Sequence, residues 1–148
     1  MEDKFVKLLI AEDDQGHFFL MKKCFTRYLK KWESLGFING SELLNFLDEQ
    51  SELDDIIIIL DINMPKLNGI ETLRHLKKSE KFSKIPVIMF TTSMNPDEIE
   101  KCYNLGCLLF ITKPIDYEEF RRKLKDLSYF ISNIGQIKDL ERFNFLLK

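Results

Sequence analysis

Short apolar runs alternate along the chain with longer segments whose apolar residues recur at helical spacing. The runs predict five strands, at residues 7–11, 32–37, 56–60, 85–90 and 108–111. The longer segments predict five helices, at about residues 16–29, 41–47, 69–78, 96–105 and 116–131. Strands that alternate with helices predict an α/β fold, in which a doubly wound parallel sheet of five strands carries helices on both faces.

The five runs are not equally apolar. Residues 56–60 have no polar alternation, which is typical of a strand buried on both faces of a parallel sheet. Glu33 and Gly36 interrupt the second run, which favours an edge position. We therefore expect the third strand inside the sheet and the second strand at its edge.

Several side chains mark the ends and faces of the predicted helices. Ser41 is a candidate N-cap for the second helix. Pro96 suits the first turn of the fourth helix, and Gly106 suits its end. The helical spacing in the first helix involves Phe18 or Phe19, Met21, Phe25, and Tyr28 or Leu29.

Polar side chains follow four of the five predicted strands. They are Glu12 with Asp13, Asp61, Thr91 and Lys113. Ligands of open parallel sheets bind beyond the carboxyl ends of the strands, where the winding reverses. We therefore expect these residues to converge on one site.

Such a site has a particular charge chemistry. Two carboxylates about 4 Å apart repel one another by roughly 4 kcal/mol at an effective dielectric constant near 20. Lys113 offsets part of this repulsion, and the oxygen ligands suit a hard divalent ion, most simply Mg²⁺, which often binds phosphate oxygens as well. Asp61 is then the natural nucleophile for a phosphoryl group. The expected contacts of the phosphoryl oxygens are the metal, held by Asp13, Asp61 and the Asn63 carbonyl, and the side chains of Lys113 and Thr91.

The composition narrows the possible functions. A chain of 148 residues is long enough for one domain, and its net charge of −2 does not indicate binding to nucleic acid or to an anionic membrane. No apolar run approaches the roughly 20 residues that span a bilayer, and the first residues lack a secretory signal, so we expect a cytoplasmic protein. Cys24, Cys102 and Cys107 are expected to be small buried apolar residues rather than metal or redox sites.

Four motifs occur in order along the chain. They are the Glu12-Asp13 pair, the Asp61-x-x-Met64-Pro65-x-x-x-Gly69 segment, Thr91 after an apolar strand, and the Lys113-Pro114 pair. Over residues 4–130 the sequence thereby resembles the receiver domain of two-component response regulators, the single-domain chemotaxis type included. The resemblance implies a flavodoxin-like fold with strand order 2-1-3-4-5.

The resemblance also implies a function for the acidic site. Asp61 would be phosphorylated by a histidine kinase or a phosphotransfer protein in a Mg²⁺-dependent step. Asp13 would bind the metal directly, and Glu12 would bind it through water. The protein would be a signalling phosphoacceptor, with self-phosphotransfer and autodephosphorylation, rather than a turnover enzyme.

Four further positions would connect phosphorylation to its outcome, again by resemblance. Thr91 would move toward the phosphoryl group, and the aromatic ring of Phe110 would turn inward with it. Asn63 and Ser93 would set the lifetime of the phosphorylated state. Thr92 is an alternative to Thr91 as the switch hydroxyl, and Phe110 taken alone suits the core as well.

Some residues fall outside the motifs. His17 follows the acidic cluster and is expected to be a solvated or lightly hydrogen-bonded loop residue rather than a metal ligand. His75 is expected at the surface. Asp14 adds an acid to the usual pattern, and residues 107–109 replace a smaller and more polar segment, which affects the shape of the output face.

Residues 1–132 are predicted to form the receiver domain, and residues 133–148 an amphipathic C-terminal extension that packs on the domain or on a second copy. The extension is too short for an effector domain. We therefore expect a stand-alone receiver, either a monomer or a phosphorylation-dependent homodimer, that signals through a downstream protein. A phosphorelay intermediate and a scaffold that never meets phosphate are alternatives. A phosphohydrolase is disfavoured, because Asn63 stands where such enzymes commonly place a second acid.

Overall fold

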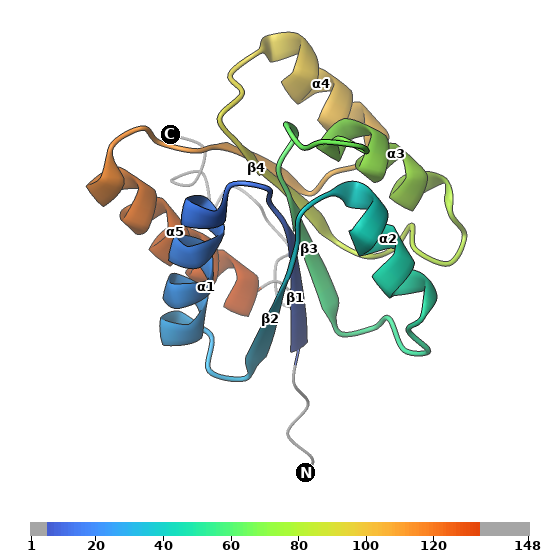
Figure 1. Ribbon diagram of the computed structural model, residues 1–148, viewed down its shortest axis with the longest axis horizontal. Coiled ribbons are helices and arrows are strands. Elements are labelled where there is room, and N and C mark those ends of the chain that lie inside the picture. Colours follow the sequence, from blue (N-terminus) through green and yellow to red (C-terminus); the bar gives the residue numbers. More distant parts are fainter. Residues whose placement is uncertain (1–5, 134–148) are drawn as a thin grey trace.

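In the computed structural model, which describes residues 6–133, strands and helices alternate along the chain (Figure 1). The strands are β1 (Val6–Ala11), β2 (Trp32–Phe37), β3 (Ile56–Leu60), β4 (Val87–Thr91) and β5 (Leu109–Thr112). The helices are α1 (Gln15–Tyr28), α2 (Gly40–Asp48), α3 (Gly69–Lys78), α4 (Pro96–Leu105) and α5 (Tyr117–Ser132). Neighbouring strands are parallel in the order β2-β1-β3-β4-β5, which confirms the predicted fold and strand order. The predicted extension, apart from residue 133, lies outside the described residues.

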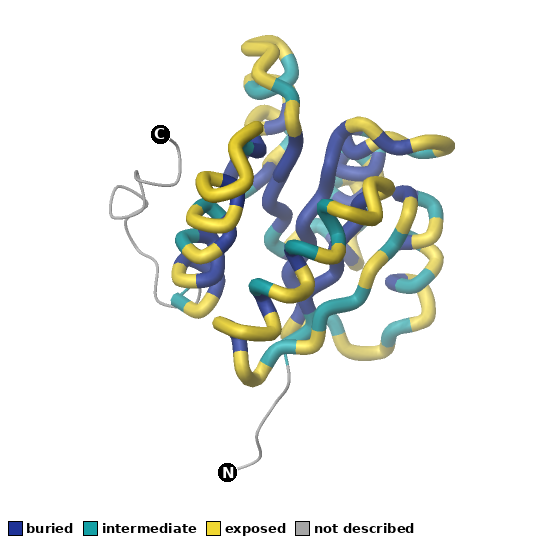
Figure 2. The backbone as a smooth tube through the Cα atoms, turned by 60° about the vertical axis from the view of Figure 1, so that its left-hand side comes forward, coloured by how far each residue is buried: buried dark blue, intermediate teal, exposed yellow. Residues whose placement is uncertain are grey.

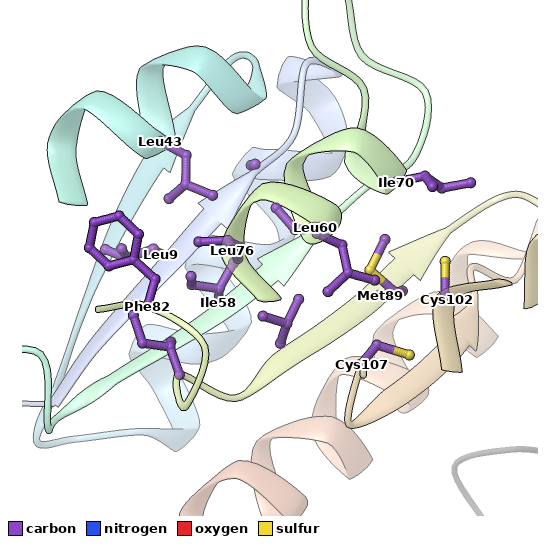
Figure 3. Packing of buried hydrophobic residues seen from close by; sticks show 14 of the residues in the cluster. Leu9, Leu43, Ile58, Leu60, Ile70, Leu76, Phe82, Met89, Cys102 and Cys107 are labelled. Carbon is purple, nitrogen blue, oxygen red and sulfur yellow. The ribbon is translucent and has the colours of Figure 1, made fainter. Parts of the chain in front are cut away.

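Two apolar layers cover the opposite faces of the sheet. Figure 1 shows α1 and α5 on one face and α2, α3 and α4 on the other. Successive residues of β3 point to different layers, because Ile58 and Leu60 belong to the cluster under α2–α4 and Ile57 belongs to the cluster under α1 and α5. Figure 3 shows Leu43 of α2 and Leu76 of α3 packed over the first of these clusters. The strand is therefore anchored from both sides.

Burial differs sharply between the central strands and the edge strand (Figure 2). Every residue of β3 and β4 is buried, whereas the residues of β2 are half-buried or exposed. The predictions of a doubly buried third strand and an edge position for the second are confirmed. Among the described residues, no helix is long and apolar enough to cross a membrane.

The helix ends follow the predicted signals at α4 but not at α2. Ser41 is not the N-cap of α2, because the side chain of Asn39 accepts a hydrogen bond from the Glu42 N–H at 2.9 Å. Asparagine and serine both cap helices well, so the local sequence does not choose between them. At α4 the predictions are confirmed: Pro96 lies in the first turn, and Gly106 ends the helix with a φ of 110°.

The inward face of α1 follows the predicted apolar spacing and selects one member of each adjacent pair. Met21, Phe25 and Leu29 are buried, whereas Phe19 and Tyr28 are exposed. Adjacent residues lie about 100° apart around a helix, and the side of α1 that faces the core covers Leu29 fully and Phe18 partly while their neighbours Tyr28 and Phe19 stay exposed.

Candidate functional site

The carboxyl ends of four strands bring the predicted site residues together. Glu12 follows β1, Asp61 follows β3, Thr91 ends β4 and Lys113 follows β5. Sheet bonding continues past the strand ends, because the Asp61 N–H donates to the Ala11 carbonyl at 3.0 Å and the Lys113 N–H donates to the Thr91 carbonyl at 2.6 Å. These four residues are buried, with at most 7% of their surface exposed. They are therefore held on rigid backbone inside the protein.

Lys113 is the cation that balances the buried carboxylates. Its Nζ donates to the carboxylate of Glu12 and, at 3.0 Å, to Oδ2 of Asp61. Burying a charge costs several kcal/mol unless a partner of opposite sign offsets the cost. When both carboxyl groups are ionised, they leave a net charge of −1 with the single ammonium, which favours a further cation.

The two buried carboxyl groups have opposite pKa shifts. Burial raises the pKa of Glu12 to about 7 against the attraction of Lys113, and the nearby Asp61 charge adds to the increase. Burial also acts to raise the pKa of Asp61, but the Lys113 charge and the neighbouring Thr91 hydroxyl outweigh it and bring the pKa below its ordinary value. Asp61 is therefore the more fully ionised carboxyl group of the pair at neutral pH, and the ionised form is the nucleophile.

Three carboxylates can offer oxygens to one metal ion. One oxygen from each of Glu12, Asp13 and Asp61 lies within 4.8 Å of the others. Both oxygens of Glu12 already have protein partners, since one contacts Lys113 and the other accepts the Asp14 N–H at 3.2 Å. Asp13 is exposed. This all-oxygen donor set fits a hard divalent cation, and the exposed Asp13 is the carboxylate with most capacity for direct contact.

Asn63 and Ser93, the residues predicted to set the lifetime, both border the pocket. The Asn63 N–H donates to Oδ1 of Asp61 at 3.4 Å. The Ser93 N–H donates to Oγ1 of Thr91 at 3.4 Å, and its hydroxyl donates to Glu98 at 2.5 Å. The role of the Asn63 carbonyl as a metal ligand and the effects of both residues on lifetime stay predictions.

Phe110, the predicted switch residue, is buried, with 5% of its surface exposed. Its backbone N–H donates to the Tyr103 hydroxyl of α4 at 2.9 Å, which links the middle of β5 to this helix. Met94 and Ile115, both strongly exposed, line a hollow between α4 and α5 together with Tyr103 and Phe110. The ring thus lies under a largely apolar surface, and its movement with Thr91 stays a prediction.

His17 is wrongly predicted as a loop residue. The structure places it in the first turn of α1, with its Nδ1 3.0 Å from Lys113 Nζ and 31% of its side chain exposed. Residue 17 lies within the predicted helix of residues 16–29, and the helix starts at Gln15, where the side chain of Asp14 caps it by accepting the His17 N–H. Sequence reasoning had no signal for the contact with Lys113, which lies 96 positions away. His75 is exposed, as predicted.

The cysteines follow the prediction with one difference. All three are free; Cys102 and Cys107 are buried, whereas Cys24 is half-buried. Burial raises the pKa of Cys102 to about 11 and that of Cys107 to about 12. These two thiols are therefore protonated at neutral pH and act as small apolar residues of the core.

Comparison with known sequences identifies a family and its members. Residues 8–125 match the family described as the response regulator receiver domain. The chain is 29% identical over 141 residues to the probable methanogenesis regulatory protein FilR2 of Methanothrix harundinacea, a match that covers 87% of this chain and 84% of that protein. It is 29% identical over 131 residues to the response regulator Rcp1 of Synechocystis, covering 86% of this chain and 84% of that protein.

Solved structures show the same arrangement. A response regulator receiver domain from Rhodospirillum rubrum aligns with a TM-score of 0.81 and 33% identity, covering 86% of this chain and 94% of that one. The Mn²⁺-bound form of the response regulator Rcp1 aligns with a TM-score of 0.78 and 25% identity, covering 85% of this chain and 94% of that one. The similarity extends over most of each chain.

Proposed function

The chain belongs to the response regulator receiver family, and from that premise we propose that Asp61 is the residue that accepts the phosphoryl group. The observation that carries the proposal is the contact between Lys113 and Asp61, which holds an ionised carboxylate at the end of a rigid central strand. Asp13 and Thr91 lie on the neighbouring strand ends. A nucleophile, a metal-binding acid and hydrogen-bond donors thus surround one point.

In the proposed reaction, an oxygen of Asp61 attacks the phosphorus of a phosphohistidine on a histidine kinase or phosphotransfer protein. An O–P bond forms and the N–P bond breaks. The electron pair stays on the departing imidazole nitrogen, which takes up a proton from solvent. The Asp61 carboxylate loses its charge in this step, so Lys113 turns from it to a phosphoryl oxygen, and the Thr91 hydroxyl donates to another.

The proposed metal is Mg²⁺. Asp13 and Asp61 would bind it directly, together with the Asn63 carbonyl, and Glu12, whose two oxygens contact Lys113 and the Asp14 N–H, would bind it through water. Mg²⁺ characteristically combines one or two carboxylates, phosphate oxygens and retained waters. When bound, it neutralises negative charge on the phosphoryl group that is being transferred.

Phosphorylation then changes which protein the domain binds, by shifting an equilibrium between two conformations. Thr91 follows the phosphoryl group, and Phe110 adjusts beneath the hollow between α4 and α5. Met94 is 74% exposed in that hollow, and Ile115 is fully exposed, which suits a protein partner. The receiver acts in the cytoplasm, as a monomer or as a phosphorylation-dependent homodimer.

Incubation with acetyl phosphate and Mg²⁺ tests the proposal directly. We expect the mass of the wild-type protein to increase by one phosphoryl group only when Mg²⁺ is present, and Asp61→Asn to abolish the increase because the amide is not a nucleophile. Asp48→Asn removes an exposed carboxylate at the end of α2 and is the matched control, with labelling equal to wild type. Undiminished labelling of Asp61→Asn would refute the assignment.

A further inference from the structure

The ammonium group of Lys113 has a third partner besides the two carboxylates. Nδ1 of His17 lies 3.0 Å from Nζ, as close as Oδ2 of Asp61. An ammonium group has three protons to donate and cannot accept a hydrogen bond. Glu12, Asp61 and His17 therefore take one proton each, with Nδ1 of His17 as the acceptor and the imidazole proton on Nε2.

Two contacts fix the position of His17, one to its backbone and one to its ring. Its backbone N–H donates to Oδ1 of Asp14, the N-cap of α1, at 3.0 Å. Its ring contacts Phe120 of α5 with the ring centroids 5.2 Å apart, and Phe120 in turn contacts Phe90 at 5.5 Å. Phe90 and Phe120 are buried in the layer between the sheet and α5. The acceptor nitrogen is therefore held in place by groups other than Asp61.

Of the three acceptors around Lys113, only Asp61 changes during phosphorylation. With acetyl phosphate, a carboxylate oxygen of Asp61 attacks phosphorus, an O–P bond forms, and the bond from phosphorus to the donor oxygen breaks. The electron pair of that bond leaves with acetate, so no proton is needed. The charge that attracted Lys113 to Asp61 then lies on the phosphoryl oxygens.

We propose that His17 is a positioning residue that holds the Lys113 ammonium while one of its hydrogen bonds passes from Asp61 to a phosphoryl oxygen. This inference rests on the proposed function of Asp61. With His17 present, two of the three bonds to Nζ persist through the step, to Glu12 and to the ring nitrogen. Without it, Glu12 is the one hydrogen-bond acceptor among the described residues that stays with this ammonium, which ends a flexible four-carbon chain.

Two substitutions separate the hydrogen bond from the packing of the ring. His17→Phe keeps a ring against Phe120 but removes the acceptor, whereas His17→Asn removes the ring but offers an oxygen near the position of Nδ1. His75→Phe is the matched control, because His75 is exposed on α3. Circular dichroism and thermal unfolding of each variant establish that it is folded.

We expect the rate of Mg²⁺-dependent phosphorylation by acetyl phosphate to fall about tenfold in His17→Phe, the effect of losing one hydrogen bond to a charged group. His17→Asn should stay within about threefold of wild type, and His75→Phe should match it. A purely structural role for the ring predicts the reverse order of the two His17 variants. The apparent affinity for Mg²⁺ should not change in any of them, because His17 is not among the proposed ligands.

The ammonium protons give a second readout that does not need the reaction. In wild type, the ¹⁵N-labelled Lys113 ammonium should give an NMR signal protected from solvent exchange, because three acceptors hold its protons. Protection should fall in His17→Phe and return in His17→Asn.

The outcomes separate the two proposals. If wild type is labelled at Asp61 but His17→Phe reacts at the wild-type rate, or if His17→Asn is as slow as His17→Phe, the role of His17 is overturned and that of Asp61 stands. If wild type is not labelled, the function proposed for Asp61 fails and the positioning role fails with it. An unprotected Lys113 signal in wild type would contradict the hydrogen bond itself.

Discussion

The central strand and the residue that follows it are almost equally buried but opposite in chemistry. Ile56–Leu60 is apolar throughout, with at most 3% of any residue exposed, and Asp61, one position later, is 7% exposed. Burying an isoleucine side chain stabilises the fold by about 2 kcal/mol without requiring a specific partner. Burying a carboxylate costs free energy unless a particular cation offsets it. Burial of similar extent therefore stabilises the fold in the strand, whereas at its end it is offset by a specific cation in a reactive site.

The difference also concerns how many residues each region depends on. An apolar residue in the layers on the sheet contacts many neighbours, which share the cost of any change. In the pocket, Lys113 serves both Glu12 and Asp61, so one substitution changes the balance of the whole site. Substitutions in the two regions should therefore separate stability from phosphorylation.

The largest effect is expected for Lys113→Met, which removes the cation and leaves two carboxylates without it. In EDTA we expect the free energy of unfolding to fall by about 4 kcal/mol, with Mg²⁺ restoring part of the loss. The rate of phosphorylation should fall roughly a hundredfold. Denaturant unfolding with and without Mg²⁺ measures the first effect. Lys125→Met, at an exposed position of α5, should stay within about 0.5 kcal/mol of wild type.

Truncation of a fully buried apolar residue should lower the stability without lowering the rate of phosphorylation. Leu76 of α3 has no exposed surface, and its truncation in Leu76→Ala should lower the free energy of unfolding by about 3 kcal/mol. The rate of phosphorylation measured well below the melting temperature should not change. Leu76→Met, which nearly conserves volume, should cost less than about 1.5 kcal/mol. A large loss of phosphorylation in folded Leu76→Ala would mean that the two regions are not separable.

A smaller effect is expected at Asn39, which is polar and buried yet has a structural role. Asn39→Ala removes the N-cap of α2 and should cost about 1 kcal/mol of unfolding free energy, with no effect on phosphorylation. Ser41→Ala should be nearly neutral, because Ser41 is not the cap. Equal losses in the two variants would contradict the observed start of α2.

Much of the fold could be predicted because the signals are local. The uninterrupted run at residues 56–60 requires burial on both faces, and the interrupted run at residues 32–37 suits an edge. The start of α2 could not be predicted, because Asn39 and Ser41 are both good caps and the choice depends on how the chain leaves β2. The exposure of Phe19 likewise depends on which stripe of α1 meets the sheet and α5.

In the candidate site, too, some residues could be placed from the sequence and one could not. The convergence of Glu12, Asp61, Thr91 and Lys113 could be predicted because parallel strands end at one edge of the sheet. The place of His17 could not, since it depends on the packing of α1 against α5, which brings its ring to Phe120 and to Lys113. The end of a strand can be located from the apolar residues that precede it. Contacts between helices depend on the tertiary structure and cannot be located from the local sequence.

Locating the phosphoryl group tests the central claim most directly. The protein is phosphorylated with acetyl phosphate and Mg²⁺ and then treated with borohydride, which reduces an aspartyl phosphate to homoserine. Peptide mass spectrometry then identifies the altered residue. We predict homoserine at position 61 and an unchanged peptide when Mg²⁺ is omitted. Reduction at Glu12, Asp13 or Asp14 instead, with Asp61 intact, would contradict the assignment of Asp61 as the phosphoacceptor.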